Sequence, residues 1–166
     1  MDPIETVAAG YDRLAAVWDD WACEVNPDLR LEYTRRLTLD VDGGANVVEL
    51  GCGTGRPVGC ALAQTFDYVG VDVSPEMVRI ASENCPDGQF FVGDMTSLSF
   101  PDASLAGVVA FHSIIHVPRE YHAGLFQDVY RWLQAGGWFV ASLGTTAQDA
   151  GTDPDWLGAG MMFWSG

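Results

Sequence analysis

The stretch from Val47 to Gly55 reads Val-Val-Glu-Leu-Gly-Cys-Gly-Thr-Gly, an apolar run with one carboxylate followed by three glycines at every second position. Glycine lets the backbone take conformations closed to other residues and lets a ligand approach the main chain closely. Glu49 places negative charge where a dinucleotide-binding loop would hold an anion at a helix N-terminus. We therefore expect a ligand that carries positive charge at the Glu49 end.

Other polar residues that could do chemistry also follow apolar stretches. Asp72 comes about twenty residues after the glycines, a spacing typical of a carboxylate that binds ribose hydroxyls. Asp94 follows a third apolar stretch, and His112 and His116 follow a fourth. Their common position predicts a shared site.

The apolar pattern predicts the elements that position these residues. We expect strands over 46–50, 68–73, 89–92, 105–111 and 138–143. We expect helices over 4–18 and 31–39, after Pro57, after the Ser74 cap and over 118–133, the last one ended by Gly136-Gly137.

Alternating strands and helices of this kind predict an α/β fold. The near-continuous apolar strands favour a doubly wound, Rossmann-like, mostly parallel sheet of order 3-2-1-4-5, with helices on both faces. Its ligand crevice lies at the carboxyl ends of the strands, where the strand order reverses. All of the polar candidates above lie at such ends.

Composition excludes several classes of function. The net charge is −15, from 23 acidic and 8 basic residues, and such a surface repels phosphate backbones. We expect no nucleic-acid partner, and without a signal peptide or membrane span we expect no membrane partner and a cytoplasmic location. Cys23, Cys52, Cys60 and Cys85 form no C-x-x-C pair, so we expect reduced thiols and no metal site.

At this point the chain resembles the class I S-adenosylmethionine-dependent methyltransferases, particularly those that modify small molecules. The resemblance covers roughly residues 7 to 143. It rests on four motifs in order, which are Val47 to Gly55, Val69 to Met77, Val92-Gly93-Asp94-Met95 and Gln134 to Trp138. It implies S-adenosylmethionine as cofactor and S-adenosylhomocysteine as product.

The resemblance implies a role for each residue of these motifs. Asp72 binds the ribose, Asp94 accepts from the adenine amino group, and the Met95 amide meets the ring. Val73 and Met77 sandwich the adenine, although helical spacing is equally consistent with Met77 in the core.

The methionine end of the cofactor is then expected at Glu49 and at the backbone of Gly51, Cys52 and Gly53. Arg56 breaks the dinucleotide spacing G-x-G-x-x-G, which makes a nicotinamide oxidoreductase the weaker alternative.

Residues 1–40 resemble the helical lid of this family. Tyr11 there reaches the methionine end, with packing on the core as the alternative, and Trp18 and Trp21 wall the acceptor pocket. Phe111 supplies backbone contacts and an adenosine wall. His116 is the candidate general base if the acceptor must lose a proton, and a structural role is the alternative. We treat His122 as a surface residue.

The C-terminus departs from the family, whose members continue with a helix and a hairpin that complete the sheet. We expect a single domain over 1–166 with a cofactor-binding core over 46–143 and an irregular tail over 144–166. The fifth strand would be an exposed edge, suited to a homodimer. A fragment, a truncation and a natural short form all explain the short tail.

The sequence thus predicts a methyltransferase that acts on an oxygen, nitrogen or carbon of a small metabolite. A catalytically silent cofactor-binding or interaction domain is the alternative from a different class.

Overall fold

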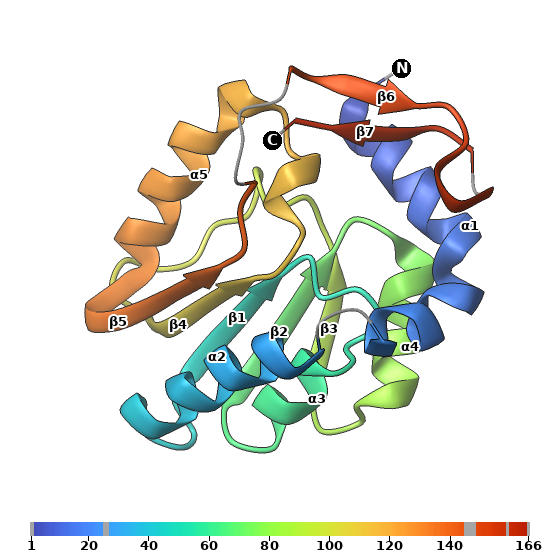
Figure 1. Cartoon of the computed structure of the whole chain (residues 1–166). Coiled ribbons are helices and arrows are strands. Elements are labelled where there is room, and N and C mark those ends of the chain that lie inside the picture. The colour runs from blue at the N-terminus through green and yellow to red at the C-terminus, as the bar shows by residue number, and fades with distance from the viewer. Residues whose placement is uncertain (1, 25–26, 145–148, 159, 166) are drawn as a thin grey trace.

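The computed structural model describes residues 2–24, 27–144, 149–158 and 160–165, and the side chains of 21–28 lie outside this description. Five parallel strands form one sheet in the order β3-β2-β1-β4-β5 (Figure 1). These strands are β1 (Asn46–Leu50), β2 (Asp67–Asp72), β3 (Gln89–Val92), β4 (Leu105–Ala110) and β5 (Leu133–Ala141). The Rossmann-like fold class and strand order predicted from the sequence are confirmed.

Helices cover both faces of this sheet. They are α1 (Pro3–Glu24), α2 (Pro27–Asp40), α3 (Val58–Ala63), α4 (Pro75–Asn84) and α5 (Arg119–Trp132), with one 3₁₀ turn, η1 (Ile114–His116). Leu37 of α2 and Leu62 of α3 pack on Val47, while Trp132 of α5 packs on Val48, which points to the opposite face. The alternation of apolar side chains along β1 therefore supplies two cores.

The start of α4 follows the predicted cap. The Ser74 side chain accepts a 3.1 Å hydrogen bond from the Met77 amide, and Pro75 occupies the first helical position. This fixes the direction in which α4 leaves the end of β2.

The end of α5 differs from the prediction. The helix stops at Trp132 and β5 begins at Leu133, so Gly136-Gly137 does not end the helix. Both glycines lie inside the strand, where the pairing of β4 with β5 shifts register between Leu105 and Gly107. Gly136 has a φ of +82°, a conformation that glycine takes without strain and that absorbs this irregularity.

The predicted irregular tail also contains regular structure. β6 (Gly151–Asp153) and β7 (Met162–Trp164) form a separate antiparallel pair, joined through the 3₁₀ turn η2 (Trp156–Gly158). This hairpin does not join the main sheet but lies beside α1 (Figure 1). Met162 is fully buried there against Val7, so the tail has a small core of its own.

Candidate functional site

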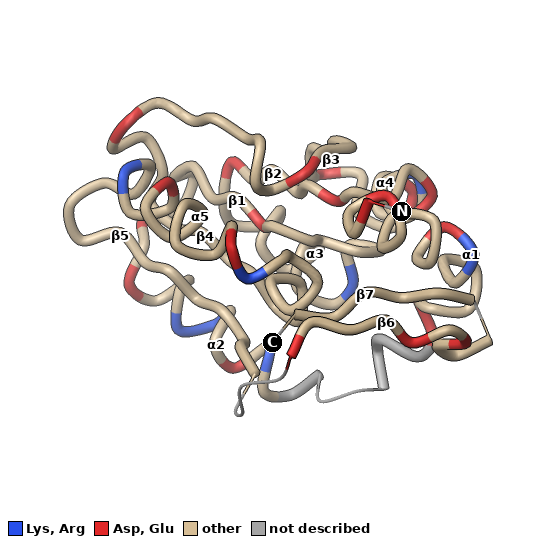
Figure 2. Tube along the Cα trace, turned by 90° about the horizontal axis from the view of Figure 1, so that it is seen from above, with Lys and Arg blue, Asp and Glu red and all other residues tan. Residues whose placement is uncertain are grey.

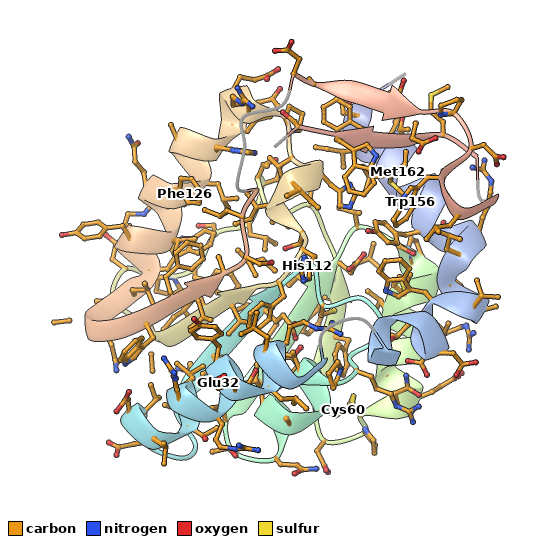
Figure 3. The ribbon with its side chains drawn as sticks, viewed as in Figure 1. Glu32, Cys60, His112, Phe126, Trp156 and Met162 are labelled. Atoms are coloured by element: carbon orange, nitrogen blue, oxygen red, sulfur yellow. A yellow bond between two sulfur atoms is a disulfide. The ribbon has the colours of Figure 1, made fainter. Side chains whose placement is uncertain are left out.

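A cavity of about 250 Å³ opens at the carboxyl ends of the strands and is bounded by α1 and the C-terminal hairpin. Figure 3 shows His112 near its centre, with Trp156 and Met162 on the hairpin side. Eleven of the twelve residues proposed from the sequence line it: Tyr11, Glu49, Gly51, Cys52, Gly53, Asp72, Val73, Asp94, Met95, Phe111 and His116. Met77 does not, because its side chain is fully buried beneath α4.

The glycine loop after β1 is held in a conformation that leaves its backbone open to the cavity. Gly51 and Gly53 have φ values of +78° and +53°. A side chain at Gly51 would collide with Ser113, and the Gly51 amide donates a 2.7 Å hydrogen bond to the Val71 carbonyl. Glycine is therefore required here both by φ and by close packing.

Asp72 ties the glycine loop to the end of β2. Its Oδ2 accepts a 2.9 Å hydrogen bond from the Gly53 amide, and its Oδ1 accepts a 3.0 Å bond from the Ser74 amide. Burial raises the pKa of this carboxyl group, and these backbone bonds oppose the rise. Each carboxylate oxygen has a further lone pair with which to accept from a ligand hydroxyl.

Glu49 lies in the same cavity and is 4% exposed. The Tyr68 hydroxyl donates a 2.6 Å hydrogen bond to its Oε2. Burial raises the pKa of Glu49 to about 8, against the opposing effects of the Tyr68 bond and the Arg30 charge. A cationic ligand group beside Glu49 would favour its ionised form.

Asp94 lines the cavity, but its carboxylate is already engaged locally. Oδ1 accepts from the Thr96 amide at 2.9 Å, and Oδ2 accepts from the Thr96 hydroxyl at 2.6 Å and the Ser97 hydroxyl at 3.3 Å. These bonds shape the turn that carries Met95 into the cavity wall.

Tyr11 and His116 form a buried pair that joins three segments of the chain. The Tyr11 hydroxyl lies 2.8 Å from Nε2 of His116, and Nδ1 of the same ring lies 2.8 Å from the Phe163 carbonyl oxygen. A carbonyl can only accept, so Nδ1 carries the proton and Nε2 accepts from Tyr11. Burial lowers the pKa of His116 to about 4, and this imidazole is therefore neutral at pH 7.

Four residues of the site were missed by the sequence reasoning. Trp156 and Trp164 come from the hairpin, which short strands in a glycine-rich segment did not reveal. Arg30 of α2 lies close enough to affect the pKa of both Glu49 and His112. Thr54, inside the glycine loop, was overlooked because attention rested on the glycines.

These residues fit S-adenosylmethionine. Thr54 Oγ1 is buried in the cavity wall and has no hydrogen-bond partner within the described part of the chain, as expected of a group that meets a ligand. Gly51 and Gly53 form a cradle that side chains would fill. Carboxylates suit the ribose and ammonium groups, and aromatic faces such as that of Tyr11 suit a sulfonium.

The cysteines require a correction. Cys60 and Cys85 form a disulfide between α3 and the end of α4, so they are not the reduced thiols that spacing suggested. Their Cα atoms lie 5.0 Å apart, although 25 residues separate them in sequence. Cys52 is a free, buried thiol, and the side chain of Cys23, like that of Trp21, lies outside the described residues.

Two searches of the described residues returned nothing. No group of three or more His, Cys, Asp or Glu side chains there is placed to hold a metal ion. Among the described helices, none has a segment long and apolar enough to cross a membrane.

Known proteins share both the sequence pattern and the fold. A phosphoethanolamine N-methyltransferase of Arabidopsis thaliana is 31% identical over 64% of this chain, and the match covers 23% of that protein. A demethylmenaquinone methyltransferase of Renibacterium salmoninarum is 29% identical over 79% of this chain and 58% of its own length. The chain thus spans well under two thirds of either relative.

A solved structure and a family profile agree with these relatives. The Haloferax volcanii methyltransferase solved with the Trm112 activator superposes with a TM-score of 0.63 at 29% identity, over 79% of this chain and 58% of that one. The profile described as "Methyltransferase domain" matches residues 47–137, more than half of the 166 residues. The chain therefore belongs to the class I S-adenosylmethionine-dependent methyltransferases.

Proposed function

We propose that this chain transfers the methyl group of S-adenosylmethionine to an oxygen, nitrogen or carbon of a small metabolite and releases S-adenosylhomocysteine. The observation that carries the proposal is the convergence of Glu49, the glycine loop, Asp72 and Tyr11 on one cavity. These residues come from separate segments, and the fold alone does not require them to meet.

Each residue has a stated task in this proposal. Asp72 accepts hydrogen bonds from the ribose hydroxyls, and Glu49 faces the ammonium of the methionine end. Asp94 and the Met95 amide meet the adenine, with Val73 and Phe111 beside it, while Thr54 offers its hydroxyl to the same ligand. When bound, the cofactor supplies an electrophilic methyl group, so the protein's main tasks are alignment and exclusion of water.

For His116 we propose a positioning role. Its Nε2 lone pair already accepts from Tyr11, and its low pKa makes it a weak base at pH 7. Through Tyr11 on one side and Phe163 on the other, His116 fixes the lid helix relative to the hairpin.

The nature of the partners follows from charge and from the relatives. Figure 2 shows acidic side chains spread over many elements and few basic ones, in line with a net charge of −15. This surface favours a small-molecule acceptor and disfavours nucleic acid. The printed names of two relatives, phosphoethanolamine and demethylmenaquinone methyltransferases, also point to small acceptors. A cytoplasmic location stays a prediction.

A homodimer through the β5 edge stays part of the proposal. In the described part of the chain β5 pairs with β4 on one side only, and Trp138 on this strand is 43% exposed. An open strand edge of this kind can accept a second copy. Sedimentation of wild type and Trp138→Lys tests this point, since the charged side chain should leave only monomer.

Calorimetry with S-adenosylmethionine, S-adenosylhomocysteine and NAD tests the proposal directly. We expect both sulfur ligands to bind and NAD not to bind, and binding of NAD alone would refute the assignment. Transfer of labelled methyl groups to a panel of acceptors then separates an active enzyme from the alternative, a silent cofactor-binding domain. Cofactor binding without transfer to any acceptor in the panel would favour that alternative.

A further inference from the structure

Five aromatic rings from three segments meet at one end of the cavity. Tyr11 and Trp18 belong to α1, His116 to η1, and Trp156 and Trp164 to the hairpin; all five line the cavity. Tyr11 lies 5.1 Å from Trp18 and 5.6 Å from Trp156, measured between ring centroids. Trp156 lies 5.2 Å from Trp164, which in turn lies 4.5 Å from His116. We call these five residues the aromatic wall.

The hairpin is fixed to the fold at the aromatic wall. Besides the bond from His116 to the Phe163 carbonyl, the Ser165 amide donates a 2.7 Å hydrogen bond to the Ile115 carbonyl. The Arg119 amide donates a 3.0 Å bond to Ser165 Oγ. The C-terminal segment therefore builds one side of the cavity and gives it two indole rings.

The charged groups around the cavity disfavour an anionic acceptor. Glu49 and Asp72 are buried carboxyl groups, and Asp94 also lines the cavity. Of the two arginines there, Arg56 is engaged with Asp19 at 3.1 Å, and Arg30 lies near Glu49 and His112. An anion at the aromatic wall would meet the negative faces of the rings as well as these acids.

We propose that the aromatic wall binds the methyl acceptor, and that this acceptor is a small molecule with a planar apolar ring and no anionic group. The inference rests on the proposed function, which puts the cofactor at the Glu49 and Asp72 side. A planar ring entering between the wall residues would replace their edge-to-face contacts by similar contacts, so opening the wall is compensated. A cationic amine gains further from the ring faces.

The inference separates this chain from its relative that is named for phosphoethanolamine, a phosphate-bearing molecule. Trp156 and Trp164 are then the residues that determine specificity. Their contribution to acceptor binding distinguishes the inference from a purely structural role of the hairpin.

The test is calorimetry on the full chain saturated with S-adenosylhomocysteine, with three probes that share a benzene ring and differ in charge. We expect phenethylamine and 2-phenylethanol to bind at least tenfold more tightly than phenylacetate, and phosphoethanolamine not to bind. Preference for phenylacetate or phosphoethanolamine, or no binding of the first two probes, would overturn the inference.

Variants locate the binding of these probes. Trp156→Ala and Trp164→Ala should each weaken phenethylamine binding at least tenfold, and Trp156→Phe and Trp164→Phe should restore most of it while keeping the hairpin folded. Trp138→Ala, on the exposed face of β5, is the matched control and should bind as wild type does. Unchanged phenethylamine binding in the folded variants contradicts the inference.

Failure of the proposed function has a different signature, because wild type would then not bind S-adenosylhomocysteine at all. In that case the same probes are titrated into the unliganded chain, and their order of affinity still decides the inference.

Discussion

The Tyr11 hydroxyl donates a 2.8 Å hydrogen bond to Nε2 of His116, and both groups are neutral at pH 7. Burial raises the pKa of Tyr11 and lowers that of His116 to about 4. The pair links the lid helix α1 to the turn after β4, and His116 extends the link to the hairpin through the Phe163 carbonyl. A single buried imidazole thus connects the three walls of the cavity.

Replacing Tyr11 by Phe should therefore destabilise the protein and weaken cofactor binding. The buried Nε2 atom would lose its donor, which costs about 1–3 kcal/mol of unfolding free energy. Urea unfolding measures this loss, and calorimetry with S-adenosylhomocysteine measures the affinity. Tyr130→Phe is the control, because that side chain is 84% exposed and should change stability by less than about 0.5 kcal/mol. Equal stability of the two variants would contradict a structural role for the pair.

The fold was predictable because each strand carries its own local signal. The apolar stretch Asn46–Leu50 has the same bounds in sequence and structure, and Gln89–Val92 does as well. Turn residues and the Ser74-Pro75 cap then placed the polar side chains at the strand ends. Because parallel strands bring these ends to one edge, most of the site followed from the order of elements.

The parts that failed depend on contacts between distant residues. β6 and β7 have three residues each, too few for a periodic pattern, and they are stabilised by packing on α1. Gly136 lies where a helix end was expected, but its positive φ instead serves a register shift against β4. The Cys60–Cys85 disulfide joins helices that only the folded sheet brings together.

Asp72→Asn should lower both cofactor affinity and stability. Both carboxylate oxygens accept from backbone amides, so an amide NH₂ would face the Gly53 or Ser74 N–H, and a ribose acceptor would be lost. We expect at least a tenfold weaker affinity for S-adenosylhomocysteine and a loss of about 1–3 kcal/mol in unfolding free energy. Asp67→Asn, at the exposed opposite end of β2, should match wild type in both. A folded Asp72→Asn variant with wild-type affinity would exclude the ribose role.

Reduction of the Cys60–Cys85 disulfide should destabilise the protein. Closing a loop across a sequence separation of 25 is worth roughly 3 kcal/mol through the unfolded state. Urea unfolding with and without reductant should show this difference, and the double variant Cys60→Ser/Cys85→Ser should not respond to reductant. Alkylation of the native, unreduced protein followed by peptide mapping is the direct check. Labelling of Cys60 and Cys85 there would show that the bond is absent.

Glu49 should make the protein less stable as the pH rises. Its pKa is raised by burial from 4.5 to about 8, so between these values the folded protein keeps a proton that the unfolded chain has released. The stabilisation is complete below pH 4.5 and is lost as the pH rises through about 8. Relative to Glu49→Gln, wild type should lose up to about 1.4 kcal/mol per pH unit within this window.

Urea unfolding of wild type and Glu49→Gln at several pH values between 5.5 and 7.5 measures this difference, since groups such as His116 that titrate in both proteins cancel in the comparison. Glu120→Gln, on the exposed first turn of α5, should show the same pH dependence as wild type. Addition of S-adenosylmethionine should lower the pKa of Glu49 if its ammonium lies against that carboxyl group, because an opposite charge favours the ionised form. With saturating ligand, the excess slope of wild type over Glu49→Gln should then shrink, whereas an unchanged slope would place the ammonium elsewhere in the cavity.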